Sequence, residues 1–207
     1  MGTLPDREYW SGLSEVVKYG LIGDADFFRW QEANTASLVS RNPPILAEAV
    51  KRCCENKANV VAADEREGGA RAKLNLGHTY GHAIENGEGY GTWLHGEAVS
   101  IGTMMALVHS YKEGWIGRDI VERVCKMFVE MNLPISLPEK TKMTPEIFKT
   151  NMQSDKKVSD GVLSLILLKG ELGSAIVTNE YSESIKEETI KLFCEYRGND
   201  FSLNKML

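Results

Sequence analysis

The sequence predicts a mainly α-helical domain with one small β-hairpin in its last third. Most segments between Ser11 and Met152 repeat apolar residues every three or four positions, the spacing of one helix face. The pattern changes between Val162 and Thr178, where VLSLILL and SAIVT are typical of two short strands joined through glycines. With 43% hydrophobic and 26% charged residues, the chain can bury a core, and we expect one compact domain over residues 1–207.

The predicted helices follow one another along the chain, several with recognisable start signals. Asp24 is a typical N-cap, and proline is favoured in the first helical turn. No glycine-rich dinucleotide motif follows a strand, so we expect no Rossmann-type cofactor site within this chain. The expected helices cover residues 11–19, a segment from Asp24 through Trp30, a long segment opened by Pro43 and Pro44, residues 74–86, 97–112 and 116–131, a short helix begun by Thr144 and Pro145, and about residues 184–196.

Charge, hydropathy and cysteine usage exclude several classes of protein. A net charge of −5 argues against a nucleic-acid partner, whose binding surface would be basic. The sequence has no apolar run near the roughly 20 residues that cross a bilayer, so we expect no membrane partner. The N-terminal segment lacks the apolar stretch of a signal peptide. The four cysteines form no C-x-x-C pair, which indicates reduced thiols in a cytosol-like compartment.

Residues 75–85 (NLGHTYGHAIE) contain the densest group of metal-ligand residue types. His78 and His82 stand four positions apart, so a helix presents both imidazoles on one face. His95 adds a third imidazole just before the next predicted helix, and Glu85 adds a carboxylate. Nitrogen and oxygen ligands of this kind suit zinc or a similar divalent ion. The group therefore indicates a metal site.

Other interpretations of the same histidines stay open at this point. A helical i,i+4 pair also occurs by accident on surfaces and in cores, and His109 lies in a Met-, Ala- and Leu-rich helix where a structural role is expected. The pair lacks the glutamate of the zincin motif H-E-x-x-H. A metalloprotease would therefore have no general base here.

Three charged segments flank the histidine region without a decisive spacing. Glu67 and Arg71 lead directly into the predicted histidine helix, and Lys156 and Lys157 precede the hairpin. Either segment is compatible with anion binding or with an ordinary solvated loop. Lys18 follows Glu15 by three positions, which also fits a simple surface ion pair on a helix.

The sequence resembles the 3-dehydroquinate synthases, members of the sugar-phosphate cyclases. The resemblance covers residues 3 to about 180 and rests on six motifs in the same order: TLPDRE at 3–8, SGLSEVVKYG at 11–20, DERE at 64–67, NLGHTYGHAIE at 75–85, GYGTWLHGE at 89–97 and DKKV at 155–158. The resemblance implies a two-domain enzyme. In it, an N-terminal Rossmann-like domain binds NAD and a helical C-terminal domain corresponds to these residues, so the NAD domain is not among them. It also implies a homodimer.

The resemblance implies a role for particular residues. Glu15, His78 and His95 correspond to the ligands of the catalytic zinc or cobalt ion. His82 corresponds to a substrate-contacting residue that handles protons, and Glu67 to a second acid/base. Further family positions are matched by substrate-binding Lys18, Lys57, Arg71, Asn75 and a lysine of the pair Lys156 and Lys157, and by NAD-contacting Thr3.

The implied reaction converts 3-deoxy-arabino-heptulosonate 7-phosphate into 3-dehydroquinate and phosphate, a step of the shikimate pathway to aromatic amino acids. Transient oxidation by NAD, phosphate elimination, re-reduction, ring opening and aldol closure would follow one another, with the metal as Lewis acid. Without its NAD domain the chain is expected to be inactive. We expect a cytoplasmic location, or a plastid in a plant or alga.

Three alternatives to this function remain. A sister cyclase would form an aminocyclitol- or valiolone-type ring from another sugar phosphate. A metal-binding helical module would have no catalytic role at all. A metal-dependent alcohol dehydrogenase would share the two-domain layout, but it lacks the cationic set of Lys18, Arg71, Lys156 and Lys157 that a phosphorylated acid substrate requires.

Overall fold

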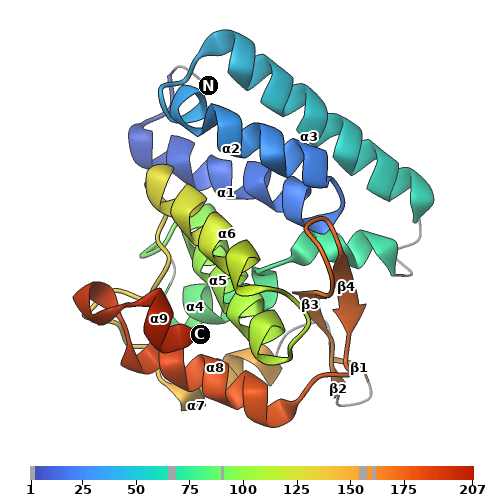
Figure 1. Ribbon diagram of the computed structural model, residues 1–207. Coiled ribbons are helices and arrows are strands. Elements are labelled where there is room, and N and C mark those ends of the chain that lie inside the picture. Colours follow the sequence, from blue (N-terminus) through green and yellow to red (C-terminus); the bar gives the residue numbers. More distant parts are fainter. Residues whose placement is uncertain (1–2, 65–68, 90, 154–157, 160–161) are drawn as a thin grey trace.

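The computed structural model describes residues 3–64, 69–89, 91–153, 158–159 and 162–207 (Figure 1). Its helices are α1 (Asp6–Ile22), α2 (Ala25–Val39), α3 (Pro43–Ala63), η1 (Ala70–Asn75), α4 (His78–Glu88), α5 (His95–Lys112), α6 (Arg118–Glu130), α7 (Pro145–Gln153), α8 (Glu183–Glu195), η2 (Gly198–Asp200) and α9 (Leu203–Met206). Its strands are β1 (Val158–Ser159), β2 (Val162–Leu163), β3 (Leu165–Leu168) and β4 (Ala175–Thr178). The predicted mainly helical fold is confirmed.

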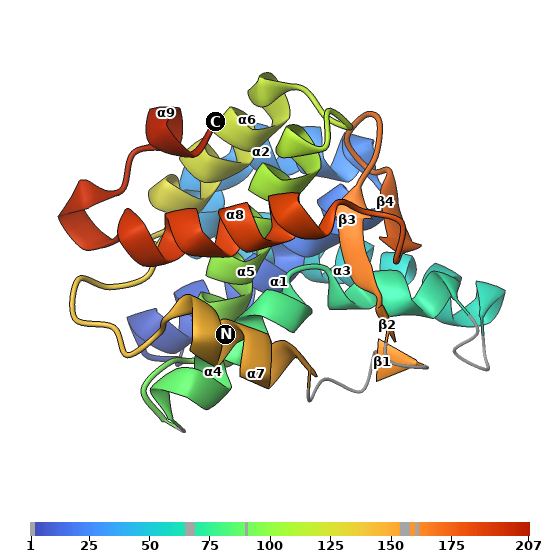
Figure 2. The ribbon, with the colours of Figure 1, turned by 90° about the horizontal axis from the view of Figure 1, so that it is seen from below.

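The helix α5 is the centre of the molecule. Apart from Glu97, every residue from Gly96 to Ser110 is buried, because α1, α4, α6, α8 and β3 all pack against it. A helix that is apolar on all sides is stable only when neighbours surround it. Figure 2 shows α8 crossing over α5, with α4 and α7 beside it. Among the described helices, α5 included, none is both long and apolar enough to span a membrane.

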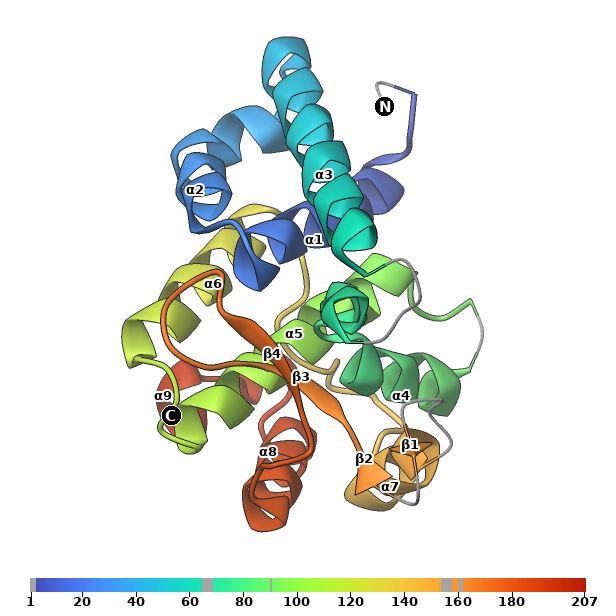
Figure 3. The ribbon, with the colours of Figure 1, turned by 90° about the vertical axis from the view of Figure 1, so that its right-hand side faces the viewer.

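The first three helices form a layer on one side of α5 (Figure 3). The helix α1 contacts α2, α3 and α5, so it connects this layer to the core. The predicted cap is confirmed at Asp24, whose carboxylate accepts the Phe27 amide at 2.8 Å. At the start of α3, Asn42 accepts the Ile45 amide at 3.4 Å and a proline occupies the first helical position.

The predicted hairpin is present as β3 and β4, which pair antiparallel from Leu165 opposite Thr178 to Leu168 opposite Ala175. The structure divides the predicted first strand at Ser164, and β2 pairs with β1 in a second two-stranded ladder. All four residues of β3 are buried against the core. The strand is continuously apolar because both of its faces are covered.

Two predicted helix starts near the histidines were wrong. The helix expected from residue 74 begins at His78, because Gly77 has a φ of 78°, in the left-handed region, and separates the 3-10 helix η1 from α4. The next boundary also differs, since His95 is the first residue of α5 and does not precede it. Both corrections place a histidine at the first position of a helix.

Candidate metal centre

Three helices each contribute one side chain to a group of metal-ligand atoms. Glu15 lies in the middle of α1, and His78 and His95 open α4 and α5. The Nε2 of His78 is 3.7 Å from the Oε1 of Glu15 and 3.3 Å from the Nε2 of His95. The three ligand atoms all lie within 4.8 Å of one another. The structure thus brings together the three residues that the family resemblance assigns to the metal.

Close backbone contacts hold these three helices in place. A Cβ on Gly96 would lie 1.9 Å from the carbonyl oxygen of Ser11, so α5 touches α1 directly beside His95. The Ser11 hydroxyl also accepts the Gly96 amide at 3.1 Å. A Cβ on Gly102 would lie 2.1 Å from the carbonyl oxygen of Gly77, so α5 and α4 meet in the same way. Glycine is required at both crossings because neither partner atom is a movable side chain.

The hydrogen bonds of the two imidazoles leave their Nε2 atoms as acceptors. The Nδ1 of His78 lies 3.1 Å from the Leu76 carbonyl oxygen, which accepts its proton. The Nδ1 of His95 lies 3.2 Å from the Oε1 of Glu85, which accepts the proton on that nitrogen. These partners fix the tautomers in which both Nε2 atoms carry lone pairs.

The third ligand atom is also an acceptor without a donor. The Oε1 of Glu15 is buried and has no hydrogen-bond partner among the described residues. With both rings neutral, two nitrogen lone pairs and one carboxylate oxygen therefore face one another. A divalent cation satisfies all three, and nitrogen and oxygen donors suit zinc or cobalt. The residues present fit such an ion.

Lys18 supplies a positive charge at the edge of the centre. Its side chain is only 5% exposed, and its Nζ donates to the Oε2 of Glu15 at 2.5 Å. Burial, reinforced by the Lys18 charge, lowers the pKa of His78 to about 4. His78 is therefore neutral at pH 7, as a metal ligand must be. The hydrogen bond to Glu85 raises the pKa of His95.

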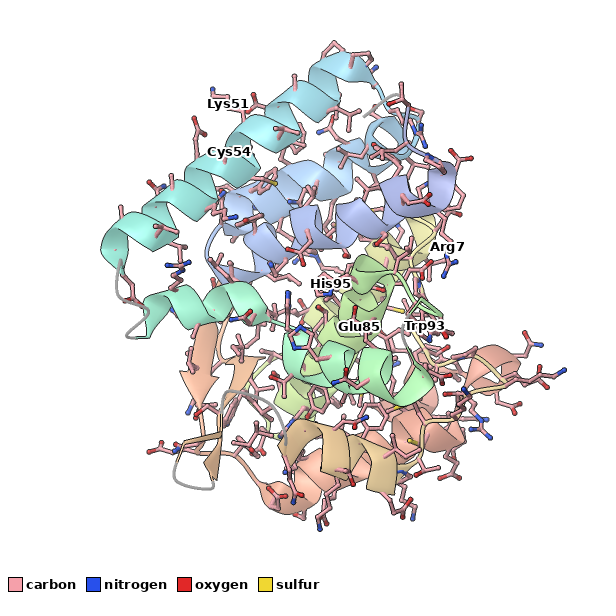
Figure 4. The ribbon with its side chains drawn as sticks, turned by 180° about the vertical axis from the view of Figure 1, so that it is seen from behind. Arg7, Lys51, Cys54, Glu85, Trp93 and His95 are labelled. Atoms are coloured by element: carbon pink, nitrogen blue, oxygen red, sulfur yellow. The ribbon has the colours of Figure 1, made fainter. Side chains whose placement is uncertain are left out.

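His82 lies beside the centre, one helical turn after His78. Its ring centroid is 5.5 Å from that of His78 and 5.9 Å from that of His95. It does not belong to the Glu15 group, but its ligand atom lies within 4.8 Å of those of Glu85 and His95. Viewed from behind, Glu85 and His95 are neighbours near the junction of the three helices (Figure 4). His82 thus lies beside the Glu15, His78 and His95 group without belonging to it.

The fourth histidine, His109, is buried in the core and separate from the metal-ligand groups found among the described residues. Its Nδ1 is 2.9 Å from the Tyr80 hydroxyl and its Nε2 is 3.3 Å from the Oε1 of Glu113. Glu113 in turn accepts the Ser182 amide at 2.6 Å. The network explains the expected structural role of His109, because each of its nitrogens has a partner.

The other residues assigned by resemblance have varied positions. Arg71 and Asn75 are half-buried in η1, which leads into α4. The Asp64 carboxylate accepts the backbone amides of Gly69 and Arg71, at 2.7 and 3.0 Å, and so organises this segment. Lys57 is exposed on α3 and Thr3 is exposed before α1. Glu67, Lys156 and Lys157 lie outside the described residues.

Sequence reasoning missed one contact that supports the centre. Arg7 on α1 donates to both carboxylate oxygens of Glu97, at 2.6 and 2.7 Å, and to the Thr92 carbonyl at 3.0 Å. Glu97 also accepts the Leu94 amide at 2.9 Å. The pair fastens the turn before His95 to α1, and Figure 4 shows Arg7 at that end of the helix layer. Both residues occur in recognised motifs, but no local spacing could have paired them.

Solved structures define the class of fold. The chain is similar to ValA, a 2-epi-5-epi-valiolone synthase from Streptomyces hygroscopicus subsp. jinggangensis 5008 with NAD+ and Zn2+ bound, with a TM-score of 0.81 and 25% identity, covering 93% of this chain and 53% of that one. It is also similar in fold to a 2-deoxy-scyllo-inosose synthase complexed with carbaglucose-6-phosphate, NAD+ and Co2+, with a TM-score of 0.78, 24% identity, and 92% and 54% coverage. The fold is that of the sugar-phosphate cyclases.

Comparisons of sequence assign the chain to one family within this fold. The 3-dehydroquinate synthase C-terminal family matches residues 12–158, and the chain belongs to this family. It is 57% identical to the chloroplastic 3-dehydroquinate synthase of Arabidopsis thaliana over 93% of this chain and 43% of the relative. It is 49% identical to the 3-dehydroquinate synthase of Pseudomonas putida (strain W619) over 96% of this chain and 53% of the relative. The chain thus spans about half the length of these relatives.

Proposed function

We propose that this chain is the metal- and substrate-binding domain of a 3-dehydroquinate synthase. The enzyme would convert 3-deoxy-arabino-heptulosonate 7-phosphate into 3-dehydroquinate and phosphate in the shikimate pathway. The observation that carries the proposal is the convergence of the ligand atoms of Glu15, His78 and His95 within 4.8 Å of one another, where the Oε1 of Glu15 is buried and has no hydrogen-bond partner among the described residues. Relatives that match nearly the whole chain at 49% and 57% identity bear the name of this enzyme.

The metal would be held by Glu15, His78 and His95, and when bound it supplies Lewis acidity to the substrate hydroxyl that is oxidised. The buried ammonium of Lys18 balances the Glu15 carboxylate and keeps its Oε2 oriented away from the two imidazoles. Next to this group, the imidazole of His82 accepts and returns protons during elimination and ring closure.

Cationic and polar side chains would hold the ends of the flexible substrate. Arg71 suits the substrate carboxylate because a guanidinium makes two parallel hydrogen bonds to it. Asn75, on the same 3-10 helix, offers both a donor and an acceptor to a hydroxyl. Lys57, Lys156 and Lys157 complete the cationic set, with Glu67 as a second acid/base. Holding one molecule through several steps is mainly a task of orientation.

The remaining half of the enzyme would supply NAD, with Thr3 of this chain at its edge. Hydride transfer requires the nicotinamide to lie against the substrate carbon, which a separate cofactor domain arranges. Two such chains would form a homodimer. The enzyme would act in a plastid if its source is a plant or alga, as the relative's chloroplastic name suggests, and otherwise in the cytoplasm.

Identity favours a 3-dehydroquinate synthase over a sister cyclase. The two curated relatives are 49% and 57% identical, whereas the valiolone and inosose synthases are 25% and 24% identical at similar coverage of this chain. A sister cyclase and a non-catalytic metal module remain the alternatives that an experiment must separate.

The test is a phosphate-release assay on the full-length protein that carries this domain, supplied with zinc and NAD. We expect release from 3-deoxy-arabino-heptulosonate 7-phosphate and not from glucose 6-phosphate, and the loss of activity in His78→Ala. The exposed α3 variant Lys51→Ala is the control. Release from glucose 6-phosphate, or from a heptulose 7-phosphate that lacks the carboxylate, but not from the expected substrate, would identify a sister cyclase. Metal binding without turnover of any of these sugars would identify the non-catalytic module.

A further inference from the structure

We propose that Glu85 is the positioning residue that orients His95 toward the metal. The proposal rests on the proposed function, because it concerns the same centre. Glu85 follows His78 by seven positions on α4, so the two side chains lie on one helix face, two turns apart. The first residue of α5, His95, packs against that face. One face of α4 thus contacts both ends of the His95 ring.

The two nitrogens of His95 have different partners. Its Nε2 is 3.3 Å from the Nε2 of His78, inside the metal-ligand group. Its Nδ1 is 3.2 Å from Oε1 and 3.4 Å from Oε2 of Glu85. A carboxylate accepts a proton and donates none, so Nδ1 carries the hydrogen, and in the neutral ring Nε2 carries the lone pair. Glu85 therefore selects the tautomer that can bind a metal.

His95 needs such a partner more than His78 does. The His78 side chain is 11% exposed and its Nδ1 is fixed by the backbone carbonyl of Leu76. The His95 side chain is 49% exposed, so packing restrains its ring far less. Both rings lie at the N-terminal end of a helix, whose positive dipole end weakens a neutral imidazole as a donor to a cation, so the difference between them is the exposure of His95. A carboxylate on Nδ1 offsets this effect and raises ligand basicity.

A rival role for Glu85 follows from the same coordinates. The ligand atoms of His82, Glu85 and His95 lie within 4.8 Å of one another and could hold a second ion. In that case Glu85 would be a ligand, and the chain would bind two ions. The positioning role requires one ion per chain, with Glu85 outside the coordination sphere.

The experiment is a Co2+ titration of the 207-residue chain, followed by visible d–d absorption and calorimetric stoichiometry. The variants are Glu85→Ala, Glu85→Gln, His78→Ala and, as an exposed control on α3, Glu55→Ala. For Glu85→Ala we expect one ion per chain, a Kd weakened by roughly 10- to 100-fold and a changed d–d band, because the His95 ring is no longer fixed. For Glu85→Gln we expect a loss of less than about 10-fold, because its Oε1 still accepts the Nδ1 proton.

The outcomes separate this proposal from the proposed function. Unchanged affinity in both Glu85 variants, or two ions in the wild type falling to one in both, would overturn the positioning role. If Glu85→Ala does not fold, as judged by near-UV circular dichroism, Glu85→Leu, which keeps the bulk of the side chain without an acceptor, decides in its place, and wild-type affinity in that variant overturns the proposal. Failure of the wild type to bind Co2+, or full binding by His78→Ala, would instead overturn the proposed metal centre.

Discussion

Lys18 illustrates how one buried charge tunes the metal centre. Its ammonium is paired with the Oε2 of Glu15, while the Oε1 of the same carboxylate faces the imidazoles. The pairing orients the carboxylate, but the positive charge also opposes a cation at the centre. A buried ammonium is kept only where its charge is matched, and here the Glu15 carboxylate supplies the matching charge.

Replacing Lys18 with methionine should therefore strengthen metal binding while it impairs catalysis. Methionine fills a similar volume without the charge. A unit charge a few ångströms from a divalent ion, at an effective dielectric near ~20, opposes the ion by roughly 5 kcal/mol or more, and the lost orientation of Glu15 offsets part of the gain from removing it. We expect a Co2+ Kd at least about tenfold lower for Lys18→Met in a chelator competition assay, and slower phosphate release by the full-length enzyme. Weaker Co2+ binding would show that the ammonium mainly orients Glu15.

His109 should make stability depend on pH in a defined direction. Burial lowers its pKa below the ordinary value of 6.5, so below about pH 6.5 the unfolded chain binds a proton that the folded chain does not. The contribution of neutral His109 to the free energy of unfolding is complete above pH 6.5, and it is lost as the pH falls toward the folded-state pKa. Urea unfolding at pH 8.0, 7.0, 6.0 and 5.5 should give falling midpoints, with a smaller fall in His109→Gln. An equal fall in the variant would assign the effect to other groups, such as His78.

At the scale of elements, the crossing of α5 with α1 and α4 determines where the ligands meet. The i,i+4 spacing of His78 and His82 could be read from the sequence, because a helix fixes that geometry locally. The approach of Glu15 to His78 could not, since it depends on which glycines face a neighbouring backbone. The burial of Lys18 depends on the same helix packing. The spacing of Glu15 and Lys18 was therefore also compatible with a surface ion pair, although Lys18 is buried.

The boundaries of helices and strands could also be predicted only in part from the sequence. The predicted helix over residues 74–86 began too early because helical periodicity continues through Leu74 and Leu76, and only the left-handed φ of Gly77 interrupts it. The hairpin was predicted correctly, since β3 is apolar without interruption and glycines follow it. The division at Ser164 depends on the pairing of β2 with β1, which a single-strand pattern does not reveal.

Gly102→Ala tests the α4–α5 crossing. Its new Cβ would meet the Gly77 carbonyl oxygen at 2.1 Å, and a backbone atom moves only if the helices separate. We expect a loss of about 1–3 kcal/mol in the free energy of unfolding and weaker Co2+ binding. Gly12→Ala is the matched control, because nothing lies within 4 Å of its Cβ and alanine favours a helix by roughly 0.5–1 kcal/mol. Equal stability of the two variants in urea titrations would show that the crossing can relax.

At the scale of the whole molecule, the chain matches about half the length of its relatives. It covers 43% and 53% of the two curated relatives, and its proposed site residues come from several elements, among them α1, α3, η1, α4 and α5. The glycine-rich turn that binds a dinucleotide does not occur in the sequence. A site shared between two domains receives groups from both. We therefore expect that the 207-residue chain by itself can bind the metal without turning over substrate.

The isolated 207-residue chain should bind zinc or cobalt yet turn over essentially no substrate. Its sequence has no glycine-rich dinucleotide turn, and only Thr3 corresponds to an NAD-contacting position, whereas the first step of the proposed reaction requires the nicotinamide to lie against the carbon that is oxidised. Phosphate release with zinc, NAD and 3-deoxy-arabino-heptulosonate 7-phosphate should be indistinguishable from a blank. The same chain, joined to the N-terminal half of the Arabidopsis thaliana relative, should release phosphate, and His78→Ala in that fusion should abolish the release. Turnover by the isolated chain at the rate of the fusion would mean that these residues contain a cofactor site of their own.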